Sequence, residues 1–104
     1  MVQQLTSEEL KQKIENKESF VLDLFATWCG PCKIMLGNLE KVSETLEQEN
    51  SPYKTYKFDI EQDMDLMKDW NVRGVPTIKI FKDGQETFTR AGVLSPDMVI
   101  SELK

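Results

Sequence analysis

The stretch that decides the fold runs from Phe20 to Cys32 and reads FVLDLFATWCGPC. Its first part, up to Ala26, is an apolar run interrupted by one acid, Asp23, which is typical of a strand covered on both faces of a sheet. Its last part carries two cysteines, Cys29 and Cys32, where the strand pattern gives way to a helical one. Thiols at this spacing can close reversibly into a small disulfide ring, so the stretch predicts a redox site at the end of a central strand.

Cys29 and Cys32 are the only cysteines in the 104 residues. A disulfide that stabilises a fold does so mainly by closing a long loop of the unfolded chain, and so short a ring constrains little. A zinc site needs about four ligands, and the chain has no histidine. A metal would have to be shared between chains or use carboxylates. A redox pair is therefore favoured over zinc and over two chance buried thiols, and we expect no metal.

The apolar residues on either side of this stretch alternate between helical and strand spacing. Helices are expected over about residues 7–17, where Thr6 and Glu9 form a capping box, from the cysteines to about 48, over 64–70, and from Pro96 onward. Strands are expected over residues 2–5, 20–26, 53–60, 75–81 and 87–90. This order predicts a three-layer α/β/α fold with helices on both faces of a mixed sheet, parallel at the front and antiparallel at the back.

The charge and the N-terminal sequence indicate which partners the protein binds and in which compartment it works. A net charge of −5 weighs against nucleic acid or an anionic membrane as the main partner. The N-terminus lacks the basic stretch and apolar core of a signal peptide, so we expect a cytoplasmic protein, although removal of a signal sequence would leave the same text. A reactive dithiol in the cytoplasm is kept reduced, which suits a donor of electrons.

Four sequence features agree with one another in their order and spacing along the chain. They are Asp23 in its strand, the run Trp28–Cys32, the segment Arg73–Thr77, and the hairpin turn Phe81–Gly84 followed by Gly92. Together they resemble the thioredoxin family over essentially the whole chain. The resemblance implies a thioredoxin fold, with five strands flanked by four helices, in a single domain over residues 1–104.

The resemblance also implies a substrate groove beside the dithiol. A cis peptide bond is expected before Pro76, and the backbone around Val75 is expected to pair with an extended segment of the substrate. The members of this groove are Trp28, Gly74, Val75, Pro76, Ala91 and Gly92. Two positions depart from the family pattern: Gly37 stands where a helix-kinking proline is usual, so we expect a milder kink, and Phe25 stands where many members carry tryptophan.

The two cysteines have different expected roles. Cys29 should lie at the start of a helix, where unpaired N–H groups and the helix dipole favour a thiolate, so it is assigned as the nucleophile. Cys32, one turn further in and less exposed, is assigned as the resolving thiol. Gly30 and Pro31 set the geometry of the ring, and in the family this dipeptide goes with reducing members.

The resolving thiol must lose a proton, and Asp23 is the candidate acceptor because burial should raise its pKa toward the working pH. An acid on the solvent face of an edge strand is the alternative. Lys57 stands at the position that the family pairs loosely with this aspartate, and we interpret it as a modulator of Asp23. Strand lysines are otherwise usually solvated.

The resemblance implies a monomeric protein disulfide reductase that binds no cofactor itself. Its electrons would come from a flavin-containing thioredoxin reductase that uses NADPH, and its clients would include ribonucleotide reductase, peroxiredoxin and methionine sulfoxide reductase. A thiol oxidase or isomerase is the alternative within the same chemistry, disfavoured by Gly30 and Pro31. A binding module with an idle dithiol is the alternative from another class, disfavoured by the intact Cys29, Cys32, Asp23 and Pro76.

Overall fold

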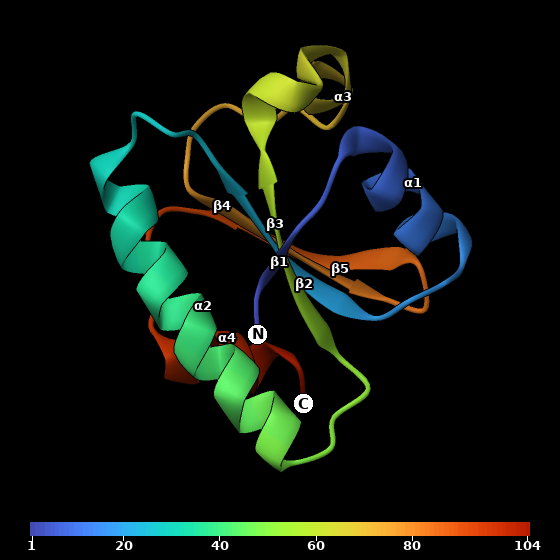
Figure 1. The fold of residues 1–104 in the computed structure, drawn as a ribbon, viewed down its shortest axis with the longest axis vertical. Helices are drawn as coiled ribbons and strands as arrows, with labels where there is room; N and C mark the ends of the chain where they lie inside the picture. Colours follow the sequence, from blue (N-terminus) through green and yellow to red (C-terminus); the bar gives the residue numbers. More distant parts are fainter.

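The computed structural model describes residues 1–104 as five strands and four α-helices (Figure 1). Along the chain the elements are β1 (Gln3–Gln4), α1 (Ser7–Glu15), β2 (Phe20–Phe25), α2 (Gly30–Gln48), β3 (Lys54–Asp59), a 3-10 turn η1 (Ile60–Gln62), α3 (Met64–Asp69), β4 (Thr77–Lys82), β5 (Gln85–Ala91) and α4 (Pro96–Glu102). The expected order of strands and helices is therefore confirmed.

The strands form one mixed sheet in the order β1-β3-β2-β4-β5. β1 and β2 both run parallel to β3, whereas β4 runs antiparallel to β2 and to β5. The apolar run around Asp23 thus lies at the centre of the sheet, as its pattern predicted. At the other end of the sheet Asp83 and Gly84 form the two-residue hairpin turn, both with positive φ.

The side chains of β2 divide between two apolar cores because successive residues of a strand point to opposite faces. Phe20, Leu22 and Leu24 pack in one core with Leu10 of α1 and Met67 of α3. Val21 packs in the other core, against apolar side chains of α2, α4 and β4: Met35, Leu39, Val42, Leu46, Val99, Ile78 and Ile80. Figure 1 shows α2 and α4 together on one side, and α1 and α3 on the other. Asp23, two residues after Val21, therefore faces α2.

The ends of several elements depart from the expected ranges. The strand expected from Val75 begins only at Thr77, because the Val75–Pro76 peptide is cis and lies in the connection before β4. α2 runs without a break through Gly37, where a Cβ atom would meet nothing within 4 Å. None of the helices is both long and apolar enough to cross a bilayer.

Candidate active site

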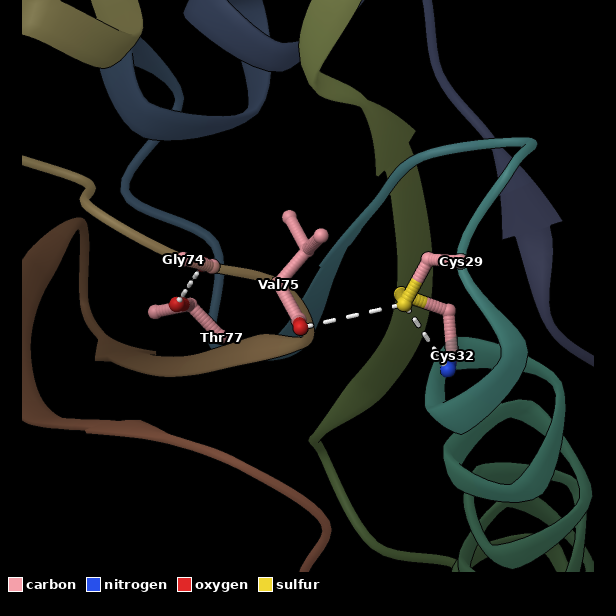
Figure 2. The surroundings of a disulfide bond; sticks show 5 residues. All are labelled: Cys29, Cys32, Gly74, Val75 and Thr77. Carbon is pink, nitrogen blue, oxygen red and sulfur yellow. Dashed lines mark hydrogen bonds between the residues drawn. A yellow bond between two sulfur atoms is a disulfide. The ribbon is translucent and has the colours of Figure 1, made fainter.

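Cys29 and Cys32 form a disulfide at the start of α2, with their Cα atoms 5.3 Å apart (Figure 2). Cys29 is the N-cap of the helix, and its Sγ accepts a hydrogen bond of 3.1 Å from the N–H of Cys32. This N–H is one of the helix-start donors that have no partner within the helix. A negative charge on Cys29 Sγ would be stabilised by the same donor and by the helix dipole.

The expected difference in exposure between the two cysteines is almost absent. Cys29 is 5% exposed and Cys32 is 4% exposed. Both pack in a small cluster with Ala26, against which Phe25 and Val75 also lie. The asymmetry of the pair therefore lies in hydrogen bonding and in position along the helix, since only the sulfur of Cys29 stands at the N-cap and accepts the backbone N–H.

Asp23 is buried on the α2 face of the sheet. It is 1% exposed, and neither carboxyl oxygen has a hydrogen-bond partner. Burial raises the pKa of this carboxyl from 3.8 to about 7, and the positive charge of Lys57 opposes part of that rise. A solvent-facing acid on an edge strand is excluded, because β2 is central.

A cavity of about 220 Å³ joins this carboxyl to the disulfide. Its walls include both cysteines, Asp23 and two lysines, with a largely apolar remainder formed by Phe25, Ala26, Thr27 and Leu36. One of the lysines is Lys57, the cross-strand neighbour of Asp23 on β3. The other is Lys33, which the sequence analysis missed. Its spacing of four residues from Cys29 on a helix could have placed it on the same helix face.

Lys57 lies beside Asp23 without a salt bridge between them. The recorded partner of its ammonium is the ring of Phe25, 5.6 Å from Nζ to the ring centroid. The Lys57 side chain is half-buried, partly within the wall of the cavity. Its charge acts on Asp23 through space.

The loop before β4 brings the backbone of Val75 next to the disulfide. The carbonyl oxygen of Val75 is 3.7 Å from Cys29 Sγ (Figure 2). Two hydrogen bonds hold this loop in place: the Thr77 hydroxyl donates to the carbonyl of Gly74 at 2.6 Å, and the N–H of Gly92 donates to the carbonyl of Pro76 at 2.8 Å. The peptide bond before Pro76 is cis, as the resemblance implied.

The other members of the expected groove divide into exposed and buried. Trp28 is 71% exposed, in line with a surface platform, and Gly74, Ala91 and Gly92 are exposed as well. Pro76 is buried. Pro76 therefore contributes to a contact surface only by positioning the backbone of Val75.

A larger cavity lies elsewhere in the molecule. It measures about 630 Å³ and is bounded by the first residues, the C-terminal half of α2 and the start of β3, with mostly polar walls. Neither cysteine nor Asp23 contributes to it. The larger cavity is therefore separate from the disulfide and from Asp23.

The family model described as Thioredoxin matches residues 1–104. Among known proteins, thioredoxin of Mycoplasmoides gallisepticum is 32% identical over 95 residues, covering 91% of this chain and 90% of that protein. Protein disulfide-isomerase of Drosophila melanogaster is 31% identical over 94 residues, covering 90% of this chain and 19% of that protein. Among solved structures, Plasmodium falciparum thioredoxin superposes with a TM-score of 0.83 at 26% identity, covering 98% of this chain and 97% of that one.

Proposed function

Because the chain belongs to the thioredoxin family of thiol-disulfide oxidoreductases, we propose that it is a general protein disulfide reductase, acting as one domain over residues 1–104. The observation that carries this proposal is the N–H of Cys32 directed at Cys29 Sγ at the start of α2, above a buried carboxyl that has no partner. The N–H of Cys32 favours a thiolate at Cys29, and the buried carboxyl, that of Asp23, is suited to accept a proton.

In the proposed reaction the thiolate of Cys29 attacks a client disulfide. A bond forms between Cys29 Sγ and one client sulfur, and the second client sulfur leaves as a thiolate. Cys32 then loses its proton to Asp23 and attacks Cys29 Sγ, which releases the first client sulfur. Two electrons pass to the client, and the chain is left with the Cys29–Cys32 disulfide.

Asp23 suits the role of proton acceptor because its pKa of about 7 lies near neutral pH. A carboxyl with an ordinary pKa would hold a proton too weakly. Lys57 supplies a nearby positive charge that keeps this pKa from rising further, so it is proposed as a modulator of Asp23. Gly30 and Pro31, both exposed at the first turn of α2, shape the ring and leave Cys29 at the N-cap.

The proposed client contact is the backbone of Val75. Its carbonyl lies beside Cys29 Sγ, and its N–H donates to no acceptor within the protein. An extended client segment pairing with this backbone would bring its own disulfide onto Cys29. Trp28, Gly74, Ala91 and Gly92 would form the walls, with Pro76 beneath them.

The proposed electron source is a flavin-containing thioredoxin reductase that uses NADPH, in the cytoplasm. Proposed clients are ribonucleotide reductase, peroxiredoxin and methionine sulfoxide reductase. A Cys32→Ser variant should trap mixed disulfides through Cys29, and the attached proteins can be identified by mass spectrometry. A Cys29→Ser variant is the matched control and should trap none. Equal trapping by both variants would refute the assigned roles.

An isomerase is the second candidate, favoured by the likeness to the Drosophila protein disulfide-isomerase. The two functions differ in reduction potential, because a reductase must hold its disulfide at a lower potential than an isomerase does. Equilibration with glutathione at defined ratios separates them. Full reduction of the Cys29–Cys32 disulfide by glutathione alone would favour the isomerase.

A further inference from the structure

The cavity under the disulfide contains a contact that the proposed reaction does not use. The ring of Phe25 lies next to the ammonium of Lys57, at 5.6 Å from its centroid, and both side chains line the cavity with Asp23. Phe25 and Asp23 are two residues apart on β2, so they share a face of the sheet. Lys57 is the cross-strand neighbour of Asp23. The three side chains therefore form one group at the wall of the cavity.

We propose that Phe25 is a positioning residue whose ring holds the ammonium of Lys57 at the cavity, close to Asp23 but not bonded to it. This inference rests on the proposed role of Asp23 as proton acceptor. Bringing an ammonium toward a low-dielectric cavity costs hydration free energy, and attraction to an aromatic face offsets part of that cost. A salt bridge to Asp23 would offset it as well, but Lys57 forms none.

The charged groups around Asp23 are few. At the start of α2 the cavity is lined by Cys29, the N-cap, and by Cys32 and Lys33, and on the β3 side it is lined by Lys57. The neighbour of Asp23 on β4 is Ile78, which is apolar. Asp59, opposite Phe25 on β3, accepts a hydrogen bond from the N–H of Glu61. Burial is the main cause of the raised pKa of Asp23, and Lys57 is the cation whose charge lowers it, so the position of Lys57 affects the proton affinity of that carboxyl.

The position of the lysine can be tested by removing the ring. In Phe25→Leu the apolar side chain remains but the aromatic face is lost, so the ammonium should move toward solvent. The pKa of Asp23 should then rise, by about half a pH unit. The smaller leucine would also admit water, and hydration alone would lower the pKa. The direction of the shift thus separates positioning of Lys57 from a change in solvation.

The measurement is the titration of the Asp23 carboxyl by carbon-13 NMR in the disulfide form, where neither cysteine titrates. Lys57→Met should raise the pKa more than Phe25→Leu does. Adding Phe25→Leu to Lys57→Met should produce no further rise, since there is no ammonium left to position. Phe25→Trp, which keeps an aromatic face, should shift the pKa less than Phe25→Leu.

A downward or absent shift in Phe25→Leu, or the same shift with and without Lys57, would overturn the proposal. If Phe25→Leu does not fold, Phe25→Met replaces it. The wild-type protein offers an independent check: ring current should move the εCH₂ protons of Lys57 upfield of the corresponding protons in exposed Lys41, and equal shifts would contradict the contact. None of these measurements needs a client, so the proposal can fail while the reductase function stands.

Discussion

Replacing Asp23 with asparagine should stabilise the protein more and more as the pH rises. Burial raises the pKa of Asp23 from 3.8 to about 7, so between these values the folded protein keeps a proton that the unfolded chain has released. The stability gained by keeping the carboxyl neutral is complete below about pH 4 and is lost as the pH rises through about 7. Asparagine at the same place stays neutral at every pH.

The size of the effect follows from the two pKa values. Their separation corresponds to about 4 kcal/mol of unfolding free energy, of which roughly 3 kcal/mol is lost between about pH 5 and pH 8. An asparagine amide in the same cavity has a desolvation cost of its own, but that cost does not change with pH. The quantity to compare is therefore the slope against pH.

Urea unfolding of the disulfide form at a series of pH values measures this slope. The chain has no histidine, and the cysteines are paired, so Asp23 is the side chain expected to titrate near neutrality. Wild type should lose stability toward alkaline pH, whereas Asp23→Asn should stay nearly level. Glu40→Gln, an exposed change on α2, is the matched control and should follow wild type. Parallel curves for wild type and Asp23→Asn would refute the raised pKa.

Two further changes test the packing away from the cavity. Gly37→Ala should raise the unfolding free energy by about 1 kcal/mol, because alanine suits a helix interior and its Cβ meets nothing within 4 Å; a loss in urea unfolding would mean that the glycine serves a bend. Glu86→Gln should destabilise by about 1 to 3 kcal/mol, because the ammonium of Lys79, itself 3% exposed, would lose the carboxylate that neutralises it and keep only neutral hydrogen-bond acceptors, the glutamine amide oxygen and the hydroxyl of Thr89. Lys79→Met should cost less than Glu86→Gln, and the double variant should resemble Lys79→Met; a larger loss in Lys79→Met would contradict this account.

The elements were predictable where local chemistry decides them. The capping box at Thr6 and Glu9 begins α1 at the expected residue, and Ser95 caps α4 with Pro96 in its first turn. Errors occurred at ends that depend on contacts with distant parts of the chain. The strand expected from Val75 begins at Thr77 because the preceding peptide belongs to the loop held against Cys29.

The sequence allowed the main residues of the candidate site to be predicted, but not the contacts between them. The sequence singled out Cys29, Cys32 and Asp23 by residue type and spacing, since thiols at this separation and an acid within an apolar strand are both unusual. It did not identify Lys33 as a wall of the cavity, nor Phe25 as the partner of Lys57. A lysine and a phenylalanine are common residues, and their significance depends on what lies beside them.

The sequence by itself determined the order of the elements and the redox pair, because hydrophobic periodicity and residue chemistry are local properties. Only the tertiary structure decided that Asp23 has no hydrogen-bond partner, that Lys57 contacts a ring instead of a carboxylate, and that Val75 lies 3.7 Å from Cys29 Sγ. These facts join three segments that are far apart along the chain, around Asp23 and Cys29, at Lys57 and at Val75. Electrostatics in a low-dielectric cavity depends on distances between such segments, and those distances exist only once the sheet and α2 are packed.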